Sequence, residues 1–200
     1  MSMTPEWSVW GAAFLQSFVT LLVIMDPFGG LPIFLTLTKN FDLPRTRHSA
    51  NRAIRVSFIL LVIVVFVGTG VLDFFGISLF SFQVGGGLIL LLLGLLYVLD
   101  IQVGSANDYK SDIIIPMATP LIAGPGAITA VILLVSQFGF WIPLAATLVN
   151  LFLFWFAMYN AHYITRAIGK QGIEILSRIM GLLLVALAVE MLRGAWLGLK

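Results

Sequence analysis

The sequence predicts an all-α, polytopic membrane protein with six transmembrane helices. We expect them to form two inverted three-helix repeats in which the first and fourth helices are interrupted. Three observations predict this fold. Of the 200 residues, 60% are hydrophobic and only 10% are charged, whereas soluble domains carry roughly 25% charged residues. Long apolar segments recur along the chain, and two of them contain clusters of proline and glycine. We treat residues 1–200 as a single membrane domain.

The first half of the chain contains three apolar segments. The first segment covers about residues 8–38, and as one helix it would be about 45 Å long, against about 30 Å of hydrocarbon. We therefore expect two half-helices, joined at residues 26–30. The second and third segments cover about residues 52–72 and 77–99. Together the three segments form repeat one, residues 8–99.

The second half of the chain contains three more segments. The fourth covers about residues 113–137 and is interrupted at residues 119–126. The fifth and sixth cover about residues 140–163 and 174–197. These three segments form repeat two, residues 113–197. Because each repeat has an odd number of spans, the two repeats must run in opposite directions across the membrane, which is the pattern of an inverted repeat.

The positions of lysine and arginine predict the orientation in the membrane. With six spans, two basic residues, Arg193 and Lys200, fall on one side. The other nine fall on the opposite side: Lys39, Arg45, Arg47, Arg52, Arg55, Lys110, Arg166, Lys170 and Arg178. Basic residues favour the cytoplasmic side, so both termini are predicted on the non-cytoplasmic side.

The first interruption has the sequence MDPFGGLPIF, residues 25–34. Asp26 is a good helix N-cap and Pro27 suits the first helical position, so a new helix is expected to begin here. The first N–H groups of that helix lack partners within the helix, and Gly29 and Gly30 allow another group to approach the backbone. A carboxylate at membrane depth is costly. Asp26 is therefore a candidate for binding a ligand, an ion or a proton, with a simple helix cap as the alternative.

The second interruption has the sequence PMATPLIAGPGAIT, residues 116–129. Gly124, Pro125 and Gly126 would start a second half-helix from the opposite direction. Helix N-termini attract anionic groups, whereas the Asp26 carboxylate and unwound carbonyls would attract cations. A zwitterion would thus be complemented at both ends. The alternative is that each interruption is only a packing kink.

Other polar and small residues indicate a binding or packing role less clearly. Asn150 lies inside the fifth segment, where it is a ligand candidate or a helix–helix hydrogen bond. Glu190, three residues before Arg193, predicts an ion pair on one helix face. Gly94 and Gly181, with residues 85–87, predict close helix contacts. The candidate substrate-binding residues are Asp26, Pro27, Gly29, Gly30, Thr119, Gly124, Pro125, Gly126, Thr129 and Asn150.

Several functions are disfavoured by what the sequence lacks. It has no cysteine, which excludes disulfides and thiolate metal sites. His48 and His162 fall at predicted helix ends, and the sequence holds no motif of a metalloprotease, serine hydrolase or phosphate-binding loop. We expect no enzyme activity, no resident metal and no cofactor beyond a coupling H⁺ or Na⁺. The basic residues 39–55 favour contact with lipid headgroups over nucleic acid.

The two interruptions, residues 25–34 and 116–129, closely resemble those of the MarC family of prokaryotic inner-membrane proteins. Residues 178–184, RIMGLLL, are also similar to the family's last helix. The resemblance covers essentially the whole chain. It implies six spans, a place in the inner (plasma) membrane, a relation to the LysE-type exporter superfamily, and transport of small neutral amino acids by at least some members.

The residues and the resemblance together favour a secondary transporter of small neutral amino acids. It would work by alternating access at a midplane site formed by the two broken helices. Two alternatives stay open. One is an exporter or channel for another small metabolite or ion, and the other is a non-transporting membrane partner protein. The sequence leaves open the substrate, the direction of transport, the coupling ion and whether the chain forms a homo-oligomer.

Overall fold

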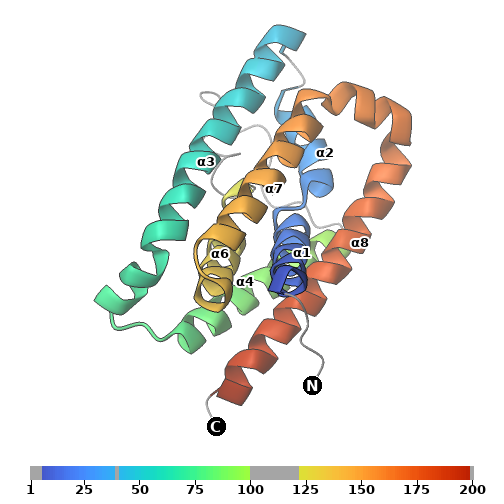
Figure 1. Cartoon of the computed structure of the whole chain (residues 1–200). Coiled ribbons are helices and arrows are strands. Elements are labelled where there is room, and N and C mark those ends of the chain that lie inside the picture. The colour runs from blue at the N-terminus through green and yellow to red at the C-terminus, as the bar shows by residue number, and fades with distance from the viewer. Residues whose placement is uncertain (1–5, 39–40, 100–121, 199–200) are drawn as a thin grey trace.

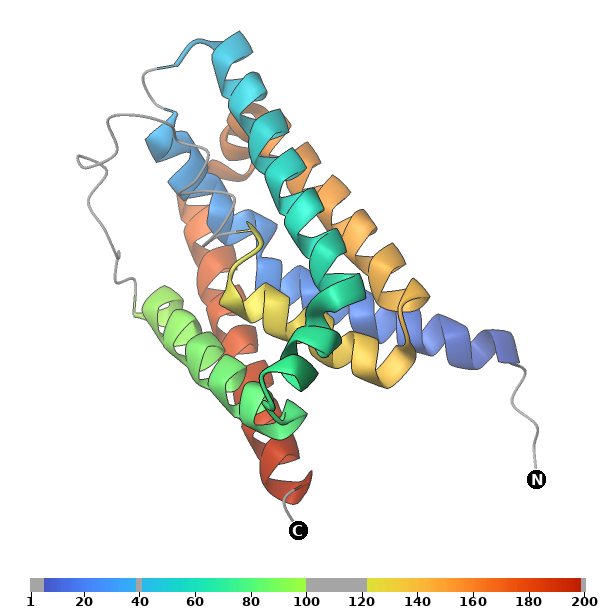
Figure 2. The same cartoon turned by 90° about the vertical axis from the view of Figure 1, so that its left-hand side faces the viewer.

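The computed structural model describes residues 6–38, 41–99 and 122–198, and every regular element in these ranges is a helix (Figure 1). The helices are α1 (Glu6–Met25), α2 (Pro27–Leu37), α3 (Leu43–Phe74), α4 (Leu79–Val98), α6 (Pro125–Phe138), α7 (Trp141–Tyr159) and α8 (Ala161–Gly198). Both views place the start of α3 at the upper end of the bundle, and the start of α1 and the end of α8 in the lower half (Figures 1 and 2).

Five segments of the described chain are long and apolar enough to cross a membrane. They are Val9–Leu31, Leu43–Phe74, Leu79–Val98, Trp141–Tyr159 and Gln171–Leu197. The prediction of a polytopic helical membrane protein is therefore confirmed. Helix α6 has 14 residues, about 21 Å, and is too short to cross alone. The preceding part of the predicted fourth segment, residues 113–121, lies outside the described residues.

Two helices begin earlier than the apolar pattern predicted. Helix α3 begins at Leu43 because Asp42 caps it: its Oδ1 atom accepts the Arg45 N–H at 3.2 Å. Helix α8 begins at Ala161 and is broken at Gly169, whose φ of 76° and ψ of 162° favour glycine. Apolar composition marks only the part of α3 inside hydrocarbon, whereas its first turns run through polar sequence. After the break at Gly169, the membrane-spanning part of α8, Gln171–Leu197, agrees with the predicted sixth segment.

Close contact between α4 and α8 holds the lower part of the bundle together (Figure 2). A Cβ atom on Gly94 of α4 would lie 2.8 Å from the carbonyl oxygen of Gly181 in α8. Only glycine permits the two backbones to approach this closely, as small residues do at many membrane helix interfaces. The close contact predicted for these two glycines is confirmed.

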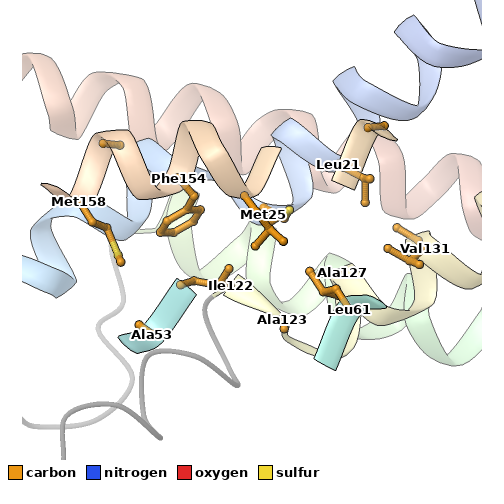
Figure 3. Packing of buried hydrophobic residues seen from close by; sticks show 14 of the residues in the cluster. Leu21, Met25, Ala53, Leu61, Ile122, Ala123, Ala127, Val131, Phe154 and Met158 are labelled. Atoms are coloured by element: carbon orange, nitrogen blue, oxygen red, sulfur yellow. The ribbon is translucent and has the colours of Figure 1, made fainter. Parts of the chain in front are cut away.

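The core lies where α1, α6 and α7 meet the middle of α3. Leu21 and Met25 of α1 pack there with Val131 of α6, Phe154 of α7 and Leu61 of α3 (Figure 3). Most buried positions of α6 are apolar, whereas the outer faces of α3, α4 and α8 expose apolar side chains, as expected for helices surrounded by lipid. This arrangement places the end of α1 and the start of α6 at the centre of the protein.

Candidate functional site

The first interruption is a sharp bend at a single residue. Asp26 has φ 43° and ψ 72°, in the left-handed region that Asp and Asn adopt more readily than other non-glycine residues. Pro27 disfavours the helical conformation for the residue before it and has no N–H to donate. Figure 1 shows α1 nearly end on, while α2 beyond Asp26 runs up the page. The predicted interruption of the first span is confirmed.

Backbone hydrogen bonds continue on both sides of this bend. The Asp26 N–H donates to the Leu22 carbonyl oxygen at 3.0 Å, and the Gly30 N–H donates to the Asp26 carbonyl oxygen at 3.1 Å. The Asp26 Oδ1 atom accepts the Gly29 N–H at 3.0 Å, so Asp26 is the N-cap of α2. The interruption therefore frees fewer carbonyl groups than the sequence analysis expected, because residues 27–30 are already helical.

The second oxygen of Asp26 is buried near the ring of Tyr97. Asp26 is 2% exposed, and its Oδ2 atom has no hydrogen-bond partner among the described residues. A Cβ atom on Gly29 would overlap this oxygen and lie 3.3 Å from Cε1 of Tyr97. The Cβ atom of Tyr97 in turn lies 2.8 Å from the point that a Cβ atom on Gly181 would occupy. An unpaired carboxylate oxygen in such surroundings is costly unless a proton, a cation or a donor joins it.

Sequence reasoning missed the position of Tyr97 beside Asp26. The two residues are 71 positions apart, and their meeting depends on the packing of α4 against α8, which brings the Tyr97 ring to Gly29. Its place three residues after Gly94, the glycine that brings α4 against α8, is the one local signal that could have found it.

The second interruption provides the start of α6. Gly124 is extended, with φ −71° and ψ 173°, and Pro125 occupies the first turn. The first helical hydrogen bond joins the Ile128 N–H to the Gly124 carbonyl oxygen at 3.0 Å. Gly124, at the N-cap position, has no side chain that could cap this end, and the N–H groups of Gly126 and Ala127 have no partner within the helix. The half-helix predicted at residues 124–126 is thus present, and Thr119 lies outside the described residues.

The described part of the second interruption lies beside the end of α1, next to the first interruption. A Cβ atom on Gly126 would lie 3.5 Å from Cγ2 of Ile24 in α1 and would overlap the side chain of Leu90 in α4. Met25, Ala127 and their neighbours belong to one buried cluster, and Figure 3 shows them facing each other. The contact between the interruptions is therefore apolar in this structure.

A cavity of about 580 Å³ opens beside the second interruption, between α3, α4 and α6. Its walls are mainly apolar, and Ser81 and Thr129 provide its polar side chains. Its lining residues are Leu60, Ile77, Ser81, Phe82, Gly85, Gly86, Ile89, Ala123, Pro125, Ile128 and Thr129. The Thr129 hydroxyl donates to the Pro125 carbonyl oxygen at 2.8 Å. Asp26 does not line this cavity, so the cavity borders the start of α6 but not the carboxylate.

Asn150 lies apart from both interruptions. It is 2% exposed, and its Nδ2 atom donates to the carbonyl oxygens of Phe18, at 3.1 Å, and Ala146, at 2.9 Å. Its Oδ1 atom has no partner among the described residues. Phe18 precedes Asp26 by eight residues, about 12 Å along a helix. Asn150 therefore joins α7 to α1 rather than lining the cavity beside Pro125.

Comparisons with known proteins agree along nearly the whole chain. A model of the MarC family integral membrane proteins matches residues 11–198. The chain is 33% identical over 200 residues to a UPF0056 membrane protein of Methanocaldococcus jannaschii, covering 92% of this chain and 98% of that protein. It is 36% identical over 194 residues to a UPF0056 membrane protein of Archaeoglobus fulgidus, covering 88% and 89%. A similar protein of Buchnera aphidicola is 33% identical over 189 residues, covering 90% and 89%. No solved structure is significantly similar to the chain.

Proposed function

Because the chain belongs to the MarC family of integral membrane proteins, we propose that it is a secondary transporter of small neutral amino acids in a prokaryotic inner membrane. The observation that carries this proposal is that the start of α6, at Pro125, packs against the end of α1, directly before the start of α2 at Pro27. Interrupted helices at corresponding places are typical of transporter binding sites. In this protein the start of α6 provides backbone N–H donors that have no partner within the helix.

The packing of the helices supports two inverted repeats, residues 8–99 and 113–197. If α2, α3 and α4 correspond to α6, α7 and α8, then exchanging the halves should preserve the contacts. Helix α2 packs on α8 and α6 packs on α4; α3 packs on α6 and α7 packs on α2. Two further pairs, α3 with α7 and α4 with α8, are their own counterparts, whereas α7 contacts α6 and α8 more closely than α3 contacts α2 and α4. This pattern is the one expected for alternating access by rocking of one repeat against the other.

The proposed roles follow the charges of an amino acid. The uncapped N–H groups at the start of α6, with Gly124, Pro125 and Gly126, would bind the carboxylate. The Oδ2 atom of Asp26, with Gly29 and Gly30 beside it, would bind the ammonium group or a coupling H⁺ or Na⁺. The cavity beside Pro125 and Thr129 would be the approach to this site. In this cycle the apolar contact between the two interruptions opens, so that one solute reaches both half-helices.

The experiment is uptake and efflux of labelled glycine and alanine by proteoliposomes under proton and sodium gradients. Asp26→Asn removes the charge of the side chain and keeps an oxygen that can cap α2. Asparagine also adopts the left-handed backbone conformation of Asp26 readily. Asp42→Asn is the matched control, because Asp42 also caps a helix, that of α3, yet it is exposed. We expect Asp26→Asn to lower transport about tenfold or more, as for loss of a hydrogen bond to a charged group, and Asp42→Asn to leave it unchanged.

Two results would contradict parts of this proposal. Transport of no amino acid by the parent protein, in either direction and under any gradient, overturns the substrate class. Equal transport by the parent and Asp26→Asn overturns the role of Asp26 and leaves the substrate class standing.

The apolar contact of Ile24 and Met25 with Ala127 favours a second function, that of a non-transporting partner protein. In that case the interruptions are packing devices, and no solute separates them. A transport-negative protein that co-purifies in fixed ratio with another membrane protein would support this second function.

A further inference from the structure

A groove of about 470 Å³ runs between α3 and α7, and none of its lining residues belongs to either interruption. One wall is a single face of α3, formed by Asn51, Ile54, Arg55 and Phe58. Their spacing of three and four residues places them on one stripe of the helix. The other wall is the corresponding stripe of α7, from Leu148 to Trp155. The groove therefore runs along the line where α3 and α7 pack against each other.

One end of the groove is polar and aromatic. The Trp155 Nε1–H donates to Oδ1 of Asn51 at 2.7 Å and joins the two helices there. The rings of Trp155 and Tyr159 have centroids 5.1 Å apart, and the Arg47 guanidinium lies 4.4 Å from the Tyr159 centroid. Tryptophan, tyrosine and arginine gather where a membrane meets water. This end of the groove thus belongs to a membrane–water interface.

The positions of the charged residues in α3 indicate how deep the groove lies in the membrane. No charged residue lies between Arg55 and Asp73, and these residues are about 27 Å apart along a helix. This length is close to the hydrocarbon thickness of about 30 Å. Arg55 therefore lies at one boundary of the hydrocarbon, and Phe58 lies one turn inside it.

The walls below Arg55 are apolar and open to the lipid. Phe58 is 43% exposed and Phe152 is 58% exposed, so an acyl chain would cover both rings in a bilayer. The Arg55 Nε atom donates to the Asn51 carbonyl oxygen at 3.3 Å. Among the described carboxylates, none forms an ion pair with Arg55. Its other guanidinium N–H groups can bind an anion, since a guanidinium has five donors.

We propose that this groove binds one anionic phospholipid. Arg55 binds its phosphate, and an acyl chain lies between Phe58 and Phe152. A zwitterionic phospholipid offers the same chains and phosphate, but its ammonium group offsets the attraction to the arginine. The site consequently discriminates by the net charge of the headgroup, and it does not depend on the proposed transport function.

The test measures lipid retention by the purified protein in detergent, by native mass spectrometry with phosphatidylglycerol or phosphatidylcholine. Arg55→Gln is expected to lower retention of phosphatidylglycerol about fivefold, because one arginine near an anionic headgroup strengthens binding by about this factor. Retention of phosphatidylcholine should stay unchanged. Arg45→Gln is the matched control, since Arg45 is exposed on the same helix, lies over the Phe41 ring and does not line the groove. It should retain both lipids as the parent does.

A second pair of variants tests the groove itself. Leu148→Trp narrows it and should lower retention of both lipids, whereas Ile59→Trp, on the lipid-facing side of α3 outside the groove, should not. Melting temperatures and elution profiles establish that each variant is folded. If Arg55→Gln fails to fold, unchanged retention by Leu148→Trp overturns the proposal.

Three further results would overturn it. The first is equal retention of the two lipids by the parent protein, and the second is an equal loss in Arg45→Gln, which indicates general attraction to a basic surface. The third is displacement of the lipid by free glycerol phosphate, which would make the ligand a soluble phosphate rather than a phospholipid.

Discussion

The ring of Tyr97 in α4 packs against the backbone of Gly29 in α2. Its Cε1 atom lies 3.3 Å from the point that a Cβ atom on Gly29 would occupy, and the same point overlaps Oδ2 of Asp26. No side chain fits between the ring and the carboxylate. Glycine at position 29 therefore allows the ring of Tyr97 to lie close to the carboxylate that caps α2.

Gly29→Ala is expected to destabilise the protein. The added methyl group overlaps the Asp26 carboxylate, which must leave its hydrogen bond to the N–H at position 29. Overpacking of this kind costs about 1–3 kcal/mol. A thermal melt in detergent measures the change. Gly11→Ala is the control, since a Cβ atom there would contact nothing within 4 Å; equal melting temperatures for the two variants would contradict the prediction.

Gly94→Ala is expected to separate α4 from α8. Its methyl group would lie 2.8 Å from the Gly181 carbonyl oxygen, a backbone atom that cannot rotate away. We expect a loss of about 1–3 kcal/mol, measured as the stability of the folded protein in denaturant. Gly85→Ala, on the same helix, meets no atom within 4 Å and should keep the parent's stability. A stable Gly94→Ala protein would show that the two backbones can move apart at little cost.

Features set by local covalent geometry could be predicted from the sequence. Both half-helix starts fall at the expected prolines, because proline lacks an N–H wherever it stands. The ion pair of Glu190 and Arg193 is present, with Oε1 and Nη2 2.6 Å apart, because residues three apart share a helix face. These predictions need no knowledge of which helices meet.

Features set by packing between distant segments could not be predicted in this way. The side chain that borders the Asp26 carboxylate, Tyr97, comes from another helix. The apolar contact between Ile24 and Gly126 depends on how deeply α6 enters the bundle. Periodicity also could not show that the Thr129 hydroxyl would bond to its own helix at Pro125, although threonine commonly does so.

Gly85→Phe is expected to block transport without unfolding the protein. Gly85 lines the cavity of about 580 Å³ beside Pro125, and its position leaves open space for a side chain. A phenyl ring there would occupy the proposed approach to the half-helix start. The measurement is amino acid flux per folded protein. Leu88→Phe, at a lipid-facing position of α4 that does not line the cavity, should transport as the parent does.

Asn150→Leu separates a structural role from a binding role. Leucine has a similar size and removes both hydrogen bonds, to the carbonyl oxygens of Phe18 and Ala146. Polar contacts between membrane helices contribute about 1 kcal/mol, so we expect a loss of that order in stability. Because Phe18, the partner of Asn150 in α1, lies about 12 Å along that helix from Asp26, the apparent affinity for substrate should stay unchanged.

Asn160→Leu is the control for this experiment. Asn160 also donates to a carbonyl oxygen, that of Phe156 at 2.9 Å, but within its own helix end. Its loss should therefore change stability less than the loss of Asn150, which joins α7 to α1. If Asn150→Leu instead keeps its melting temperature and weakens substrate binding, the amide acts on the solute, and the proposed site must extend from Asp26 along α1 to Phe18.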